Sequence, residues 1–243
     1  MVLFMTSSPD GHTWDDPMSA VSMDAANDFI NNLKKFWKDG ARGLFVACNP
    51  ADYAENDKMS SILMNSLKLS GLEVLSMDIC DDRNTDITKT YDFMILAGGH
   101  LPTQNEFFKR INMKETVNNY EGIVIGISAG TMNCAKIVYS LPEEEGETFD
   151  ENFDRFPEGL GLTGIQVIPH YQYLFDKSVD GRLMIDELAA KDSIGHEFYL
   201  LNDGSYFLKK DGIMTLYGEA YLLKDGVKTK ICENNQSIVI EDI

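Results

Sequence analysis

The sequence predicts an α/β protein, a three-layer sandwich with a mostly parallel central sheet, followed by C-terminal β-hairpins. Short apolar runs alternate with amphipathic segments, as in repeated strand–helix units. After about residue 195 the pattern changes to short strands separated by turn residues. A length of 243 residues suits one compact domain. We therefore expect a single domain over residues 1–243, with residues 225–243 as a C-terminal β extension.

Six apolar runs are the predicted strands of the α/β part. They are residues 2–5, 43–48, 73–78, 93–96, 122–125 and 164–168. Apolar side chains recur at helical spacing in residues 22–37 and in residues 60–70, where Gly71 follows as a C-cap. Residues 131–139 are a third predicted helix. Right-handed crossovers should place such helices on both faces of the sheet.

The C-terminal part is predicted to consist of short strands joined by tight turns. The predicted strands are residues 198–201, 205–209, 213–217, 221–223, 228–232 and 237–240. Asp-Gly pairs at 203–204, 211–212 and 225–226 are strong hairpin signals, because both central residues of a type I′ turn need a positive φ. The Asn pair at 234–235 predicts another hairpin.

Composition and charge limit the partners. The formal net charge of -18 argues against a nucleic-acid partner and against anionic membranes. No apolar stretch reaches the ~20 residues of a membrane helix, and residues 1–5 are too short for a signal peptide, so we expect a cytoplasmic protein. The cysteines are widely scattered and lack metal-ligand spacing, which predicts free thiols and no metal or other cofactor. They are Cys48, Cys80, Cys134 and Cys232.

The segment Gly126-Ile127-Ser128-Ala129-Gly130 lies between a predicted strand and a predicted helix. This is the Gly-x-Ser-x-Gly pattern of a nucleophile elbow in the context that such an elbow requires. Small residues flank the serine because bulky ones would collide with neighbouring elements. The helix N-terminus should direct its N–H groups and dipole at a developing oxyanion. Ser128 is therefore the predicted nucleophile; the alternative is a tight turn with a solvated serine.

A serine nucleophile needs a base, and His170 is the first candidate. It follows Pro169 just beyond the predicted strand 164–168, and ligands bind at the carboxyl ends of strands in open α/β sheets. The alternative is a loop histidine bonded to the backbone. We expect His12 on the surface and His196 in a structural role.

A third group should orient the histidine, and Asp203 is our first choice for it. It lies in the turn after the predicted strand 198–201. Glu197 and Glu219 are the alternatives. On its own, an Asp before a Gly is also ordinary turn chemistry.

The paired glycines Gly98 and Gly99 directly follow the predicted strand 93–96. Without a Cβ, they allow a backbone N–H to approach a reacting atom, so they are candidates for the oxyanion hole; the alternative is a plain turn. His100 is a candidate for substrate contact. The acidic run Glu143–Glu147 lies in a loop-like stretch, 141–161, that is either merely solvated or a flap over the active site.

Three blocks of the chain resemble the S51 peptidase family, which contains peptidase E (aspartyl dipeptidase) and cyanophycinase. They are residues 96–100 (LAGGH), 126–130 (GISAG) and 168–171 (IPHY). The resemblance implies a class I glutamine amidotransferase-like, flavodoxin-like fold with Ser in place of Cys. It puts the nucleophile on Ser128, the histidine on His170 and the acidic member, a Glu in the family, on Asp203. It implies Gly99 and Ala129 as the oxyanion donors.

The substrate side of the site departs from the family pattern. Peptidase E has Asn where this chain has His100. It binds an N-terminal aspartate through an Arg, for which Arg182 is the nearby candidate, although an ungapped alignment places Gly181 there. Tyr171, beside the histidine, is a further candidate for substrate binding.

The expected function is a serine-type peptidase for short peptides, dipeptidase E-like, with N-terminal Asp-X peptides among its candidate substrates. One alternative is a related serine hydrolase or amidase with another substrate, isoaspartyl or cyanophycin-like. Another is a catalytically silent amidotransferase-like binding module. The family contains monomers and homodimers, and the sequence favours neither.

Overall fold

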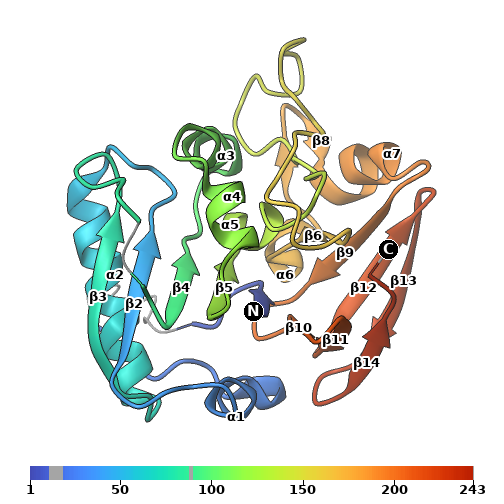
Figure 1. Cartoon of the computed structure of the whole chain (residues 1–243). Coiled ribbons are helices and arrows are strands. Elements are labelled where there is room, and N and C mark those ends of the chain that lie inside the picture. Colours follow the sequence, from blue (N-terminus) through green and yellow to red (C-terminus); the bar gives the residue numbers. More distant parts are fainter. Residues whose placement is uncertain (11–18, 88–89, 243) are drawn as a thin grey trace.

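The computed structural model describes residues 1–10, 19–87 and 90–242. An eight-stranded sheet has the order β14-β11-β10-β1-β5-β4-β2-β3 (Figure 1). Five neighbouring strands run parallel, and three C-terminal strands extend the sheet antiparallel. The parallel strands are β1 (Val2–Thr6), β2 (Ala41–Val46), β3 (Val74–Cys80), β4 (Phe93–Leu96) and β5 (Ile123–Ile127). The antiparallel ones are β10 (Tyr206–Lys210), β11 (Ile213–Tyr217) and β14 (Ser237–Ile240).

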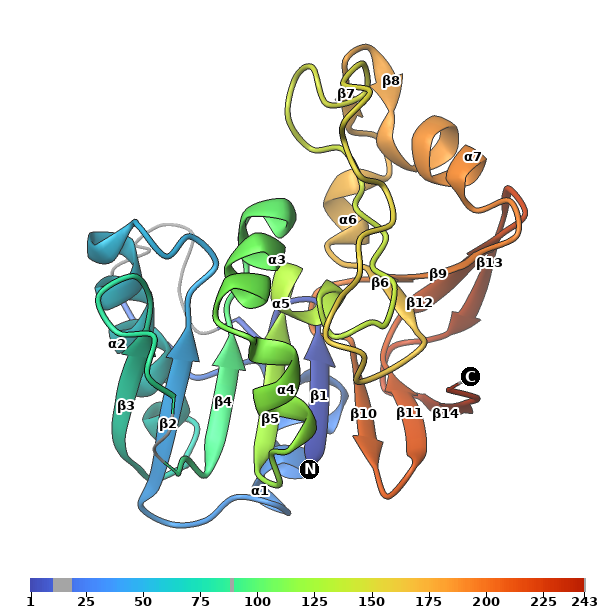
Figure 2. The ribbon, with the colours of Figure 1, turned by 45° about the horizontal axis from the view of Figure 1, so that its top comes forward.

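Helices cover both faces of this sheet, which confirms the predicted fold class. In Figure 2, α3, α4 and α5 lie in front of the sheet, and α1 and α2 lie behind it. The helices are α1 (Phe29–Lys34), after a 3-10 turn at Ala26–Asp28, α2 (Tyr53–Leu69), α3 (Leu101–Arg110), α4 (Met113–Asn118) and α5 (Ala129–Met132). None of the helices in the described residues is long and apolar enough to cross a membrane.

A second sheet of four strands has the order β13-β12-β9-β6. Its strands are β6 (Gln166–Ile168), β9 (Glu197–Leu201), β12 (Ala220–Lys224) and β13 (Val227–Cys232). The strand predicted at 164–168 therefore belongs to this sheet and not to the central one. Around it lie α6 (Tyr171–Leu174), a hairpin of β7 (Ser178–Val179) and β8 (Arg182–Leu183), a π-helical turn (Met184–Ala189) and α7 (Ala190–Asp192).

Two of the four predicted hairpins form. Asp211-Gly212 and Asp225-Gly226 have positive φ at both residues and join β10 to β11 and β12 to β13. The hairpin predictions at 203–204 and 234–235 are wrong, because at each the chain leaves one sheet and enters the other. At 203–204 and 234–235 the turn residues connect strands of different sheets. The local sequence of such a connection does not differ from that of a hairpin turn.

The helix predicted at 131–139 is also wrong over most of its length, because α5 ends at Met132. Beyond it the chain is extended and bonds to residues 155–163: the N–H of Lys136 donates to the Thr163 carbonyl (2.8 Å) and that of Val138 to the Pro157 carbonyl (2.9 Å). Long-range backbone hydrogen bonds have thus replaced helical ones in this segment.

Candidate active site

Ser128 lies in the sharp turn between β5 and α5, with φ 51° and ψ -114°. Its N–H is shared between the carbonyls of Thr6 (3.2 Å) and Ser7 (3.1 Å) at the end of β1. A Cβ on Gly126 would lie 2.8 Å from the Thr131 nitrogen, and one on Gly130 would lie 2.1 Å from the Leu96 oxygen. The turn therefore needs glycine at both flanking positions, as the sequence pattern predicts.

Ser128, His170 and Asp203 form one chain of hydrogen bonds. The Ser128 Oγ lies 2.9 Å from His170 Nε2, and His170 Nδ1 lies 2.7 Å from Asp203 Oδ1. His170 follows β6 and Asp203 follows β9, and these strands are parallel neighbours, so their carboxyl ends present the two side chains together. This arrangement can deprotonate the serine hydroxyl and stabilise the resulting imidazolium.

The electrostatics of Asp203 favour its charged form. Burial opposes ionisation, but hydrogen bonds from His170 and Ser7 and the charge of His170 outweigh it, so the pKa of Asp203 lies below its ordinary value. The carboxylate is thus ionised at neutral pH, as a group that orients an imidazole must be.

Ser7 is a residue of this site that the sequence reasoning missed. It is fully buried, and its hydroxyl donates to Asp203 Oδ1 (2.7 Å) while accepting from the His170 backbone N–H (2.8 Å). Gln172 was also missed; its Oε1 accepts from the Asp203 N–H (3.0 Å). The available signal for Ser7 was its position just beyond a predicted strand, at the edge where Ser128 was expected.

The structure places the alternative acids elsewhere. Glu197 bonds Lys224 (2.6 Å), and Glu219 bonds Tyr221 (2.6 Å). His196 stacks on Phe156 with ring centroids 4.5 Å apart. His12 lies outside the described residues.

Of the predicted substrate contacts, Tyr171 packs against Tyr221, with centroids 4.8 Å apart. Arg182 is exposed in β8, and its guanidinium lies 5.7 Å from the Phe149 ring centroid. Neither residue lines the cavity at Ser128 that is described below.

The loop after β4 packs against the nucleophile. A Cβ on Gly98 would lie 3.2 Å from the Ser128 Cβ, and one on Gly99, whose φ is 140°, would lie 2.7 Å from Cys48 Sγ. Burial raises the pKa of the Cys48 thiol to about 12, so it is no competing nucleophile.

Ala129 is the first residue of α5, so its N–H has no acceptor within the helix. Because α5 has only four residues, the helix dipole expected from the sequence contributes little here.

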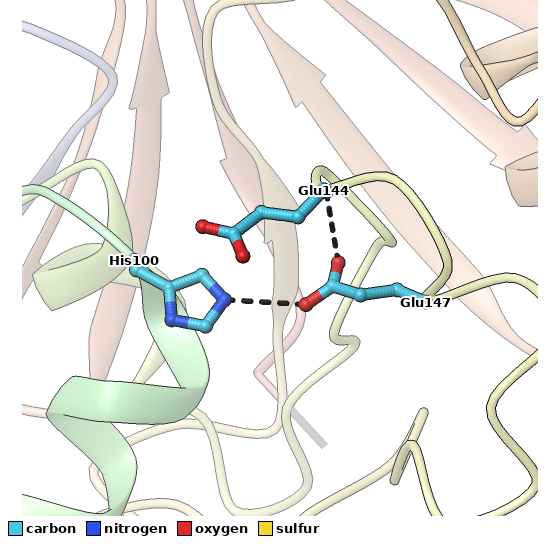
Figure 3. A group of neighbouring side chains, drawn as sticks. All are labelled: His100, Glu144 and Glu147. Atoms are coloured by element: carbon cyan, nitrogen blue, oxygen red, sulfur yellow. Dashed lines mark hydrogen bonds and ion pairs between the residues drawn. The ribbon is translucent and has the colours of Figure 1, made fainter.

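His100 bonds the acidic loop, as Figure 3 shows. Its Nδ1 lies 2.8 Å from Thr103 Oγ1, and its Nε2 lies 3.3 Å from Glu147 Oε1. The Glu144 carboxylate points toward the same imidazole (Figure 3), and ligand atoms of His100, Glu144 and Glu147 lie within 4.8 Å of one another. One imidazole and two carboxylates are ligands that could hold a divalent metal ion.

A cavity of about 370 Å³ adjoins Ser128. Its wall includes Ser128, His170, Asp203 and the glycine loop, with Phe45, Met59 and Leu63 as apolar members. A larger cavity of about 680 Å³ lies at the opposite edge of the sheet, beside the first residues of β1, β4 and β5, and is remote from the hydrogen-bonded chain. The smaller cavity is therefore the candidate substrate site.

Comparison with known proteins shows the fold. No protein-family model and no curated protein matches the sequence. Among solved structures, a peptidase from an acI-B1 Actinobacterium is similar, with a TM-score of 0.59 and 15% identity over 98% of this chain and 96% of that chain. The chain thus has an α/β fold that a peptidase also has.

Proposed function

We propose that this protein is a serine-type peptidase that hydrolyses short peptides. The observation that carries the proposal is the continuous hydrogen-bonded chain from Ser128 through His170 to Asp203 at a cavity wall. The fold shared with a peptidase supports it. A catalytically silent binding module would not need a serine, a histidine and an aspartate at these distances.

The proposed reaction is acyl transfer to water. Ser128 Oγ attacks the carbonyl carbon of the substrate while His170 Nε2 accepts its proton. The N–H groups of Gly99 and Ala129 stabilise the tetrahedral oxyanion. His170 then donates the proton to the leaving amine, and the C–N bond breaks to leave an acyl-enzyme. A water molecule, deprotonated by His170, hydrolyses the ester and restores the Ser128 hydroxyl.

The size of the site supports short substrates. A volume of about 370 Å³ is near the lower end for small-molecule sites. The loop 141–161 contacts His100, a residue of the cavity wall, through Glu147 (3.3 Å). We infer that this loop limits the length of a bound peptide.

The first experiment compares wild type and Ser128→Ala on a panel of dipeptides, with Asp-X beside neutral X-X peptides and simple esters. We expect wild-type hydrolysis of dipeptides, loss of roughly 10³-fold or more in kcat for Ser128→Ala, and labelling of Ser128 by a fluorophosphonate. Hydrolysis of esters alone would favour the related-hydrolase alternative. Folded protein that neither cleaves nor reacts with the probe would favour the binding module.

A further inference from the structure

The cavity at Ser128 extends from the catalytic groups toward α2. Its wall includes Ser128, which follows β5, the glycine loop, which follows β4, and residues of β2 and α2. The three strands lie side by side in this order in the large sheet. Phe45 of β2 and Met59 and Leu63 of α2 line the far part. Met59 and Leu63 are one helical turn apart and thus share a face of α2.

The surface of this far part is apolar. Phe45 is 2% exposed and Leu63 is 4% exposed, so both belong to the hydrophobic core and still border the cavity. Cys48 and Ala97, which are also buried, line the cavity between β2 and the glycine loop. Met59 is only partly buried. An apolar group of a ligand that displaces water from this surface gains free energy in proportion to the area buried.

The polar side chains near α2 are already bonded within the protein. Asn56 is buried, and its Nδ2 donates to the Asn49 carbonyl (3.0 Å) and to Asp81 Oδ2 (3.3 Å). The Asp52 carboxylate caps α2 by accepting from a backbone N–H (3.3 Å). Glu55 forms an ion pair with a lysine of the same helix (3.2 Å). These groups therefore do not have to be satisfied by a substrate.

The charges of the wall disfavour a charged substrate side chain in this part. Among the lining residues that the structure describes there is no lysine or arginine, whereas Asp10, Asp52, Glu55 and Asp203 are acidic. An acidic side chain would lose its hydration without gaining a cation. A basic side chain that reached α2 would place its charge among apolar groups, and Asp52, Glu55 and Asp203 are already bonded.

We propose that the peptides cleaved at Ser128 carry an uncharged, apolar side chain next to the scissile bond, bound by Phe45, Met59 and Leu63. The inference rests on the proposed function, because it takes Ser128 as the nucleophile and its cavity as the substrate site. An aliphatic side chain of leucine size replaces water on the apolar wall and leaves no polar group unpaired. This substrate class differs from the Asp-X peptides that the sequence suggested.

Three dipeptides test the proposal at nearly constant shape. The side chains of leucine, asparagine and aspartate branch in the same way, so Leu-Ala, Asn-Ala and Asp-Ala differ in polarity and charge. With wild type in EDTA, we expect kcat/KM about 10-fold or more higher for Leu-Ala than for Asn-Ala, and lowest for Asp-Ala. The set Ala-Leu, Ala-Asn and Ala-Asp places the side chain on the leaving side, and a preference for leucine in either set supports the proposal. Equal kcat/KM values in both sets, or faster cleavage of Lys-Ala than of norleucyl-Ala, would overturn it.

Two methionines of α2 provide a matched pair of variants. Met59 and Met64 are both partly buried against the core, and of the two only Met59 lines the cavity. Met59→Lys should lower the ratio of kcat/KM for Leu-Ala to that for Asp-Ala at least about 10-fold, because it adds a cation and removes apolar surface. Met59→Ala should lower kcat/KM for Leu-Ala without raising it for Asp-Ala, and Met64→Lys should leave the ratio unchanged. An unchanged ratio in Met59→Lys, or an equal change in Met64→Lys, would contradict the assignment.

Calorimetry with Ser128→Ala separates this inference from the proposed function, because it measures binding without turnover. A lower Kd for Leu-Ala than for Asp-Ala, combined with wild type that neither cleaves peptides nor reacts with a fluorophosphonate, would defeat the peptidase proposal alone. Wild-type cleavage of all these dipeptides at the same kcat/KM would defeat this inference alone. Folded protein that neither binds nor cleaves any of them would overturn both.

Discussion

Ser7 connects both partners of Ser128 to the end of β1. Its hydroxyl holds the Asp203 carboxylate and the His170 backbone at once, at 2.7 and 2.8 Å. A side chain that touches neither the substrate nor the reacting proton can still set the angle at which the imidazole meets the serine. We therefore assign Ser7 as a positioning residue.

Replacing Ser7 with alanine tests this role. The His170 N–H would lose its acceptor and Asp203 would lose a donor, so we expect kcat/KM to fall about 10- to 100-fold. Because the lost hydrogen bond favours the ionised carboxylate, the acid limb of the pH–rate profile should also move to higher pH. Ser205→Ala is the matched control, since that buried hydroxyl bonds the Glu219 carbonyl instead. If both variants lost kcat/KM equally and the acid limb of the pH–rate profile did not move in either, the role of Ser7 would be merely structural.

The element that presents the nucleophile is a strand, a turn and one helical turn. Its close packing explains the glycines: a Cβ at Gly130 would collide with the Leu96 carbonyl of β4, and one at Gly126 would collide with the Thr131 backbone. The Thr131 hydroxyl in turn donates to the Thr6 carbonyl (2.8 Å). These contacts hold Ser128 in a backbone conformation that a free serine would rarely adopt.

Gly130→Ala should therefore distort the elbow. A Cβ only 2.1 Å from a backbone oxygen forces β4 or α5 to move, which should lower the free energy of unfolding by about 3 kcal/mol or more and abolish labelling of Ser128. Gly212→Ala is the control: its Cβ meets nothing within 4 Å, so only the positive φ costs stability, about 1 kcal/mol. Urea unfolding of both variants measures the difference, and similar losses would refute the packing argument.

At the scale of the whole molecule, the site lies where the two sheets meet. The large sheet supplies Ser7 and Ser128, from the ends of β1 and β5. The small sheet supplies His170 and Asp203, from the ends of β6 and β9. The distance between serine and histidine thus depends on how the sheets are joined, and the C-terminus takes part in that joint. Asp242 accepts from the Thr163 hydroxyl (2.6 Å), the Gly164 N–H (2.8 Å) and Lys209 (2.5 Å).

Asp242→Asn should weaken this joint in a pH-dependent way. Burial raises the pKa of Asp242, but Lys209, Thr163 and Gly164 outweigh it, so the pKa lies below its ordinary value of 3.8. The carboxylate therefore stabilises the fold fully above pH 3.8, and this contribution disappears as the pH falls through the lowered pKa. Urea unfolding at pH 7 should show a loss of about 1–3 kcal/mol in the variant, with the gap to wild type narrowing toward pH 3. Glu241→Ala, at an exposed neighbour, should behave as wild type; a gap independent of pH would contradict the assignment.

The sequence by itself determined the features that depend on neighbours along the chain. The parallel strands follow from buried apolar runs, the hairpins at 211–212 and 225–226 from residues that tolerate positive φ, and the elbow from small residues around Ser128. Each of these features depends on a steric or burial requirement of a few consecutive residues, so a short stretch of sequence is enough to predict it.

Only the tertiary structure decided what depends on partners distant in sequence. Residues 135–139 belong to a predicted helix, yet their long-range backbone hydrogen bonds join them to residues 157–163. Asp203 reads as a hairpin turn, yet the chain there crosses between sheets and brings the carboxylate to His170, 33 positions away. Ser7 carried no motif, because its role arises from contacts 163 and 196 positions distant. Hydrogen bonds of this kind form only after the two sheets have packed, so no local pattern specifies them.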